Sequence, residues 1–249
     1  MTQEERLVEL SEWIAKEGKV TQELICQRYG ISYDSARRDL VKLAQLPGIT
    51  RIRGGAMRQR EHQPGIPYRE RSVDAVKARL AKRAASMIQP SDVVLLDTGT
   101  TLEALAKALI VPATVVTNSV DILYALSGHS DLRRIMLGGE FDPFNRAIYS
   151  REALQQLAGY QADKAFIGVP GLSAQGLSCE KELEAGVKLA MARQAAYRIC
   201  VCERSKFNQR FVYQSCGWQD IDCLITDAAP PANILALLEQ HDIDLQVVA

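Results

Sequence analysis

The sequence predicts an α/β protein of two domains, a small N-terminal helical domain and a larger domain built on a mainly parallel sheet. Residues 1–57 carry three short helical patterns followed by a strand and a glycine turn. Residues 58–72 are charged and contain two prolines and a glycine, a composition typical of a linker. In residues 73–249, apolar runs alternate with helical patterns, which indicates a doubly wound sheet covered by helices on both faces.

Three helices are expected in the small domain. Apolar residues recur at helical spacing within residues 4–17. Thr21 is placed to cap a second helix, which Gly30 ends. Ser32 caps the third helix, whose predicted buried stripe consists of Tyr33, Ala36, Leu40 and Leu43.

The third helix and the segment after it carry the residues expected to bind double-stranded DNA. Ser35, Arg37 and Arg38 lie on its exposed side, where a recognition helix meets base edges and arginine can bond guanine twice. Gly54–Gly55 turns a strand pair typical of a wing. The pattern predicts a winged helix-turn-helix over residues 1–57, with its helix-turn-helix unit at about 20–39. The predicted DNA-binding residues are Thr21, Ser32, Tyr33, Ser35, Arg37, Arg38, Lys42, Arg51 and Arg53.

Charge supports a nucleic-acid partner. The formal net charge of the chain is +0, but basic residues gather around the third helix and wing, where the only acids are Asp34 and Asp39. Binding to phosphates needs such local positive charge. Alternatively, Arg37 and Arg38 form a solvated face paired with these two aspartates. The three-helix pattern and the attached wing favour the DNA interpretation.

The larger domain, residues 73–249, is expected to alternate strands and helices. The expected strands are 93–97, 114–118, 133–137, 164–169, 198–203, 222–226 and 244–248. The expected helices are 73–87, 101–109, 119–127, 151–159, 180–196 and 231–240. In parallel sheets of this kind, ligands bind at the carboxyl ends of the strands.

Small and hydroxyl-bearing residues lie at those strand ends. The loop 97–101 runs from a strand into a helix, so its amides and hydroxyls suit an anion, while Asp97 suits sugar hydroxyls. Together these loops predict a site for a phosphorylated sugar or polyol, formed by Asp97, Thr98, Gly99, Thr100, Thr101, Thr117, Asn118, Ser119, Gly138, Gly139 and Lys206. Each element alone is more often a helix cap, a turn or a solvated lysine. Their recurrence at successive strand ends favours a ligand site.

The cysteine, histidine and hydropathy patterns argue against a metal site, a redox site and a membrane span. None of the six cysteines forms a Cys-x-x-Cys pair, and the three histidines lack metal-ligand spacing. Cys200 and Cys202 are most simply reduced thiols in the core, with a metal or redox site as the alternative. We therefore expect no cofactor and no metal. The polar N-terminus and the lack of a long apolar run predict a cytoplasmic protein that does not bind membranes.

The chain resembles the DeoR family of bacterial transcriptional regulators over nearly its full length. The resemblance rests on motifs in the same order, among them Ser32–Leu40, Arg53–Ala56, Leu96–Thr101, Val116–Ser119, Leu137–Gly139, Ala165–Gly168, Ser205–Phe207 and Ile225–Asp227. It implies a sensor domain similar to phosphosugar isomerases and deaminases. It also implies a repressor released by a phosphorylated sugar, and a homo-oligomer, dimer or tetramer. Three departures from the family pattern, at Tyr149, Glu203 and Asn208, are expected to alter the pocket wall.

Three functions are compatible with these features. The favoured one is a sequence-specific DNA-binding regulator, a repressor, that responds to a phosphorylated sugar or related metabolite. A second is a phosphosugar isomerase or deaminase fused to a DNA-binding domain, for which Asp97, Glu180, Glu182 and Glu184 are the candidate general bases. The three glutamates fit a solvated helix face equally well, so we expect no enzymatic activity. The third is an architectural DNA protein with a vestigial pocket.

Overall fold

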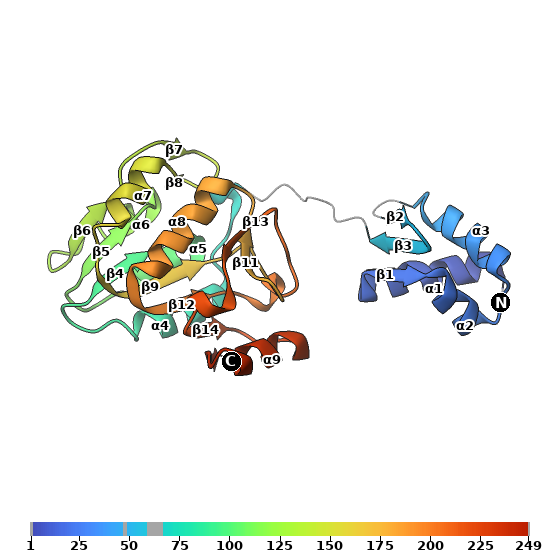
Figure 1. The fold of residues 1–249 in the computed structure, drawn as a ribbon. Coiled ribbons are helices and arrows are strands. Elements are labelled where there is room, and N and C mark those ends of the chain that lie inside the picture. The colour runs from blue at the N-terminus through green and yellow to red at the C-terminus, as the bar shows by residue number, and fades with distance from the viewer. Residues whose placement is uncertain (1, 47–48, 59–66, 249) are drawn as a thin grey trace. The chain divides into compact units, whose positions relative to one another are not determined.

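The chain forms two compact units, one within residues 1–65 and one within residues 66–249. The computed structural model describes residues 2–46, 49–58 and 67–248 (Figure 1). Most of the predicted linker, residues 58–72, lies outside these ranges, but Tyr68–Glu70 form a short 3-10 helix, η1, that belongs to the second unit. No helix in the described ranges is long and apolar enough to cross a membrane.

The first unit is a three-helix cluster with a small sheet. Its helices are α1 (Gln3–Glu17), α2 (Gln22–Tyr29) and α3 (Tyr33–Leu43), and its strands are β1 (Lys19–Thr21), β2 (Ile49–Ile52) and β3 (Gly55–Arg58). The strands pair antiparallel in the order β1-β3-β2. Leu10, Ile14, Ile25 and Leu40 form part of its closed apolar core. The three helices and the wing are as predicted, whereas β1 is too short to leave a periodic signal.

Local capping signals determine where these helices begin and end. The Thr21 hydroxyl accepts from Leu24 N–H and the Ser32 hydroxyl accepts from Ser35 N–H, as predicted. Gly30 takes the left-handed conformation that ends α2, with φ of 61°. One expectation is wrong: Tyr33 is 60% exposed rather than buried. As the first residue of α3, it extends past the stripe that packs against the other helices.

The second unit contains a seven-stranded parallel sheet in the order β15-β14-β12-β9-β4-β5-β6. The strands are β4 (Val93–Leu96), β5 (Thr114–Thr117), β6 (Arg133–Met136), β9 (Ala162–Gly168), β12 (Ala195–Val201), β14 (Cys223–Thr226) and β15 (Asp244–Val247). The helices are α4 (Ala75–Ala85), α5 (Thr100–Ala108), α6 (Val120–Ala125), α7 (Arg151–Leu157), α8 (Glu182–Arg193) and α9 (Ala232–Gln240). Every predicted strand and helix is present, with ends shifted by a few residues.

Helices cover both faces of this sheet, as predicted (Figure 1). Leu95 and its face of the sheet pack with α7, α8 and α9, while Leu96 and the opposite face pack with α4, α5 and α6. Chain order reverses at β4, because β5 and β6 extend the sheet on one side and β9 and later strands on the other. Parallel sheets bind ligands at such a reversal point, outside the carboxyl ends of the strands.

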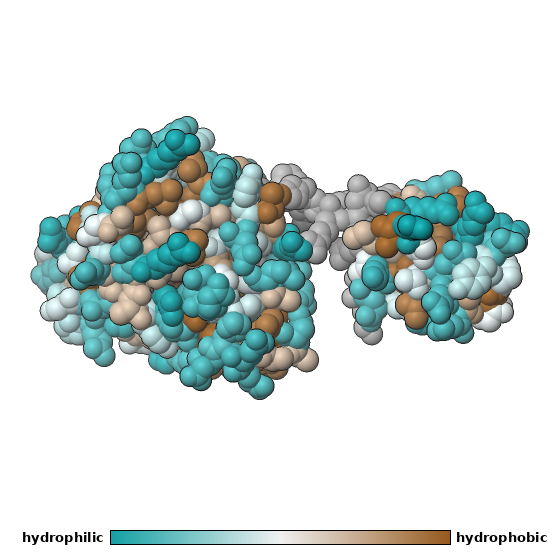
Figure 2. Space-filling view, viewed as in Figure 1, coloured by the Kyte–Doolittle hydropathy of each residue, from teal (hydrophilic) through white to brown (hydrophobic). Residues whose placement is uncertain are grey.

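Several small elements surround the main sheet and were not predicted. A second sheet joins β10 (Gly171–Ser173), β11 (Gly176–Cys179) and β13 (Tyr213–Cys216). A hairpin joins β7 (Phe141–Asp142) to β8 (Ala147–Ile148), and two further 3-10 helices are η2 (Arg204–Lys206) and η3 (Trp218–Asp220). Strands of two to four residues are too short to show alternation. On the face in Figure 2, apolar residues are scattered over a largely hydrophilic surface.

Candidate DNA interface and effector site

Helix α3 presents its basic residues to solvent. Arg37 and Arg38 are exposed, and Ser35 is half-buried beside its capping residue. The Arg38 Nε donates to the backbone oxygen of Asp34 at 3.3 Å, not to its carboxylate. The Arg37 guanidinium has no hydrogen-bond or ion-pair partner within the described ranges. Both guanidinium groups therefore remain available to an external anion.

A buried network fixes the other side of α3. The Asp39 carboxylate is fully buried and accepts from Gln3 Nε2 at 2.7 Å and from Arg6 Nε at 2.9 Å. Lys42 Nζ donates to the Gln3 side chain at 2.7 Å. The alternative pairing of Arg37 and Arg38 with Asp39 is therefore wrong, because the Asp39 carboxylate is buried and bonded to Gln3 and Arg6. Lys42, a predicted DNA contact, shares this network while remaining exposed.

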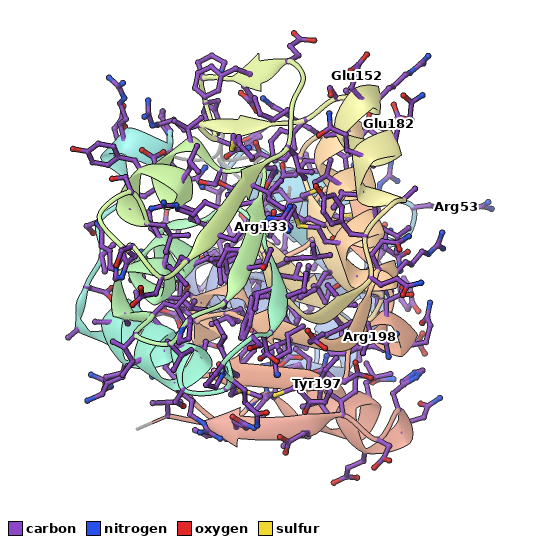
Figure 3. The ribbon with its side chains drawn as sticks, turned by 90° about the vertical axis from the view of Figure 1, so that its left-hand side faces the viewer. Arg53, Arg133, Glu152, Glu182, Tyr197 and Arg198 are labelled. Atoms are coloured by element: carbon purple, nitrogen blue, oxygen red, sulfur yellow. The ribbon has the colours of Figure 1, made fainter. Side chains whose placement is uncertain are left out.

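The wing carries two further exposed arginines. Gly54 turns between β2 and β3 with φ of 76°, a conformation that favours glycine. A Cβ at Gly55 would lie 2.2 Å from the Val20 oxygen, so only glycine lets β3 pair closely with β1. Arg51 and Arg53 are exposed, and the Arg53 side chain projects away from the ribbon (Figure 3). The predicted basic residues thus lie on two neighbouring elements of one small unit.

In the second unit, Asp97 follows β4 and forms the centre of a buried polar cluster. Its Oδ2 accepts from Lys188 Nζ of α8 at 2.5 Å and from Gly168 N–H at the end of β9 at 3.1 Å. Lys188 Nζ also donates to the Gly168 oxygen at 2.9 Å and lies 3.5 Å from Glu184 Oε1. The cluster therefore joins β4 to β9, where the chain order reverses.

Burial and neighbouring charges shift the pKa values of two members of this cluster, Lys188 and Glu184. Burial opposes the charge of the Lys188 ammonium, but Asp97 and Glu184 outweigh it and raise the pKa of Lys188. Burial raises the pKa of Glu184, with Lys188 acting in the opposite direction. The expectation of a solvated face for Glu184 is wrong, since it is 5% exposed. The sequence did not predict a role for Lys188. Its spacing of four residues from Glu184 on the same helix is the signal that could have indicated the pair.

Two buried oxygens beside this cluster lack partners. Among the atoms that the structure describes, Asp97 Oδ1 and the Tyr149 hydroxyl receive or donate no hydrogen bond. Burial raises the pKa of Tyr149, and Glu184 and Asp97 raise it further. Unsatisfied buried polar atoms are costly and occur preferentially at functional sites. Tyr149 is buried directly after β8, and its effect on a pocket wall stays a prediction.

The hydroxyl-bearing loops have local structural roles. Thr98 Oγ1 donates to the Asn145 oxygen, Thr117 Oγ1 donates to the Leu96 oxygen, and Ser119 caps α6. Thr100 and Thr101 lie in the first turn of α5, which begins after Gly99 and is not capped by any described side chain. The amides of that turn point toward the strand ends, as an anion site requires.

The remaining predicted ligand residues are less closely tied to this centre. Gly138 N–H donates to Gln156 Oε1 at 3.0 Å. A Cβ at Gly139 would lie 1.9 Å from Ser150 Oγ, so packing against the start of α7 already explains this glycine. Asn118 is buried and its Nδ2 donates to the Ile148 oxygen. Lys206 is half-buried, and its ammonium has no hydrogen-bond or ion-pair partner in the part of the chain that the structure describes.

A cleft of about 490 Å³ opens beside the first turn of α5. The sequence did not predict this cleft, because three residues of its wall, Tyr68, Arg69 and Arg71, fall in the predicted linker. The lining residues are Tyr68, Arg69, Arg71, Val73, Thr100, Glu103, Asp121 and Arg146. Tyr68 is 5% exposed, and its hydroxyl donates to Glu103 Oε2 at 2.8 Å. Among the described residues, no group of three or more His, Cys, Asp or Glu could hold a metal.

Comparison with protein families identifies both units. Residues 6–62 match the DeoR-like helix-turn-helix domain, and residues 73–228 match the DeoR C terminal sensor domain. The chain belongs to the DeoR family. The resemblance seen in its motifs and the two-part fold class are thus confirmed, as is the function of a DNA-binding transcriptional regulator at the level of the family.

Relatives of this DeoR-family chain are named transcriptional regulators. It is 37% identical to the HTH-type transcriptional repressor GlcR of Bacillus subtilis, over 99% of this chain and 97% of that protein. It is 27% identical to the glycerol-3-phosphate regulon repressor of Escherichia coli, over 99% of this chain and 100% of that protein. Among solved structures, a D-ribose-5-phosphate isomerase in complex with phospho-erythronic acid covers 55% of each chain, with 18% identity and a TM-score of 0.41.

Proposed function

We propose that this protein is a sequence-specific repressor that binds operator DNA through its first unit and a phosphorylated sugar or polyol through its second. The DNA role rests on the different positions of acidic and basic side chains on α3. The Asp39 carboxylate is buried and accepts hydrogen bonds from Gln3 and Arg6, while Arg37 and Arg38 remain exposed. A helix whose buried acid is bonded within its own unit, and whose exposed side is basic, can place that basic side in the major groove of DNA.

In this proposal the contact residues divide by task. Ser35, Arg37 and Arg38 read base edges, because they occupy the outer side of the first turns of α3. The remaining predicted residues hold the phosphate backbone: Thr21, Ser32, Tyr33, Lys42, Arg51 and Arg53. A homo-oligomer, dimer or tetramer, would place two such units on a palindromic operator. Partnership with DNA and six free cysteines support a cytoplasmic location.

The effector would bind at the strand ends, around residues 97–101, 117–119 and 138–139 and Lys206. The unpartnered Asp97 Oδ1 suits a sugar hydroxyl, and the first turn of α5 and the Lys206 ammonium suit a phosphate. The name of the glycerol-3-phosphate regulon repressor associates one relative with a phosphorylated polyol. Asp97 Oδ2 is already held by Lys188 and Gly168, which disfavours Asp97 as the general base of an isomerase.

The test of the DNA role is a pair of arginine variants. An operator would first be selected from random duplexes with the full-length protein. Arg38→Ala is expected to weaken that operator by about 1–3 kcal/mol and to relax its sequence preference. Arg53→Ala is expected to weaken all duplexes alike and to reduce the salt slope by about one. Fluorescence anisotropy over a salt series measures both quantities.

Arg193→Ala, an exposed arginine at the end of α8, is the matched control and should bind as the parent does. If both interface variants bound operator and random DNA like this control, the assignment of α3 and the wing would be wrong.

A further inference from the structure

A glutamine of the first unit is hydrogen-bonded to both elements that the proposed function places on DNA. Gln22 is the first residue of α2, directly after β1, and is half-buried. Its backbone N–H donates to the Gly54 oxygen, in the turn of the wing between β2 and β3, at 2.8 Å. Its side-chain Nε2 donates to the Tyr33 oxygen, at the start of α3, also at 2.8 Å. Gln22 therefore connects the wing to α3.

The bond to the wing does not depend on the Gln22 side chain. Thr21 pairs with Gly55 across β1 and β3, and the Thr21 hydroxyl caps α2. A Cβ at Gly55 would lie 2.2 Å from the Val20 oxygen, so this pairing requires glycine. Backbone contacts thus hold the start of α2 beside the wing turn. They remain in place when only the side chain of Gln22 is changed.

The bond to α3, in contrast, is made by the Gln22 amide group. Its acceptor, the Tyr33 oxygen, belongs to the first residue of α3, next to the capping residue Ser32. The side chains assigned to base reading follow in the first turns of the same helix: Ser35, Arg37 and Arg38. Because they belong to one helix, a displacement of its first turn moves all of them together.

Base reading and phosphate binding differ in how much displacement they tolerate. A hydrogen bond to a base edge weakens steeply when its distance or angle departs from the preferred geometry. A phosphate contact carries no sequence information directly, and a long arginine side chain can follow a small shift of its backbone. The placement of α3 relative to the wing therefore affects sequence preference more than it affects general affinity for DNA.

We propose that Gln22 is a positioning residue for sequence-specific DNA binding, whose amide fixes the start of α3 relative to the wing while the wing holds the phosphate backbone. This inference rests on the proposed function and deepens it. It assigns a contribution to sequence preference to a residue that contacts neither a base nor a phosphate.

Gln22→Met tests this role in the full-length protein. Methionine keeps the length and helix propensity of glutamine but cannot donate to the Tyr33 oxygen. Binding to the operator selected by the parent should weaken about fivefold, the effect of one neutral hydrogen bond. Random duplexes should bind with unchanged affinity and an unchanged salt slope, because the phosphate contacts remain. Fluorescence anisotropy over a salt series measures both.

Gln27→Met is the matched control, because Gln27 is an exposed glutamine of the same helix. It should bind operator and random duplexes as the parent does. A second variant, Gln22→Glu, removes the same donor, and an acid in the first turn of a helix is favourable, so this variant is expected to fold. Its negative charge weakens binding to every duplex, but its ratio of operator to random affinity should fall about fivefold, as in Gln22→Met.

The binding data separate positioning from direct contact. If Gln22→Met bound both kinds of duplex like Gln27→Met, the positioning role would be overturned. An equal weakening of operator and random duplexes would overturn it in favour of a phosphate contact. Selection of duplexes repeated with Gln22→Met should show reduced preference at every base position read by α3. Loss at a single position, with the others intact, would make Gln22 a base contact instead.

The arginine variants decide the proposed function separately. If Arg38→Ala and Arg53→Ala behave as expected while Gln22→Met matches its control, only the positioning role is wrong. If both arginine variants bind like the parent, the assignment of α3 and the wing is wrong, and the role of Gln22 is overturned with it.

Discussion

Each unit of this protein buries an aspartate against a basic side chain, and the two sites differ in how completely they are satisfied. In the first unit, both carboxylate oxygens of Asp39 accept hydrogen bonds, from Gln3 and Arg6. In the second, Asp97 uses only Oδ2, toward Lys188 and Gly168, and its Oδ1 has no partner among the described atoms. The fully bonded carboxylate of Asp39 therefore has a structural role, whereas the unbonded Oδ1 of Asp97 can still accept a hydrogen bond from a ligand.

Solvent access separates the two sites as well. The Arg6 side chain is 12% exposed, so it can reach water if its partner is lost. The Lys188 side chain is 2% exposed and has no such route. Removing the acid from a buried pair leaves an uncompensated charge, which costs more than the pair itself contributed. Lys188 should therefore depend on Asp97 more than Arg6 depends on Asp39.

The largest effect is expected for Asp97→Asn. The change leaves the Lys188 ammonium with the Gly168 oxygen and with Glu184, at 3.5 Å, as the remaining acid of the cluster, and we expect the sensor unit to lose about 3 kcal/mol of unfolding free energy. The two tryptophans, Trp13 and Trp218, lie in different units. Urea unfolding followed by Trp218 fluorescence in a Trp13→Phe background therefore reports the sensor unit alone.

The control for this prediction adds Lys188→Met to Asp97→Asn. Removing these two charges, together with Glu184→Gln, should recover much of the lost stability, because no charge of the cluster then remains buried and unpaired. If Asp97→Asn alone left the unfolding free energy unchanged, the two sites would not differ in the way proposed.

A smaller effect is expected for Asp39→Asn. The amide cannot pair with Arg6, but Arg6 can turn toward water, so the first unit should lose about 2 kcal/mol. Trp13 fluorescence in a Trp218→Phe background measures this loss. The matched control is Asp34→Asn, an exposed aspartate on the same helix. Equal unfolding free energies for the two variants would contradict a structural role for Asp39.

The sequence alone predicted what is encoded locally. Thr21, Ser32 and Gly30 delimit helices because a cap depends only on neighbouring residues. The alternation of strands and helices likewise follows from periodicity within short windows. The same reasoning failed at Tyr33, whose apolar ring matched the helical stripe while its place in the first turn left it exposed.

Long-range pairs could not be predicted in this way. Lys188 lies 91 residues from Asp97 in sequence, and only the assembly of β4, β9 and α8 brings them together. The residues of η1 have a linker composition, yet Tyr68 is buried by contacts with Phe144 and Glu103. No local pattern distinguishes such a docked segment from a solvated one. The candidate cleft was therefore missed, although the loop next to it was identified.

The smallest effect is expected for a third pair, Arg198 with Asp222, which is satisfied like Asp39 but partly exposed. Asp222 accepts from the Arg198 N–H, Nε and Nη2, at 2.8, 2.6 and 2.5 Å. Both side chains keep about a quarter of their surface exposed, at 28% and 27%. Hydrogen bonds from Arg198 lower the pKa of Asp222 in the folded state. Exposure screens the charges, so Asp222→Asn should cost only about 1 kcal/mol at neutral pH.

The sign of the pH dependence follows from that lowered pKa. The stabilising contribution of Asp222 is present above its unfolded-state pKa, near 3.8, and is lost as pH falls through the lower folded-state value. The unfolding free energies of the parent and Asp222→Asn should therefore differ from pH 7 down to about pH 4 and converge only as the pH falls further. Urea unfolding of the sensor unit across this range measures the convergence. A difference that persisted at low pH would mean that the amide disturbs packing rather than charge, and complete hydrogen bonding could then no longer be separated from burial as the source of stability.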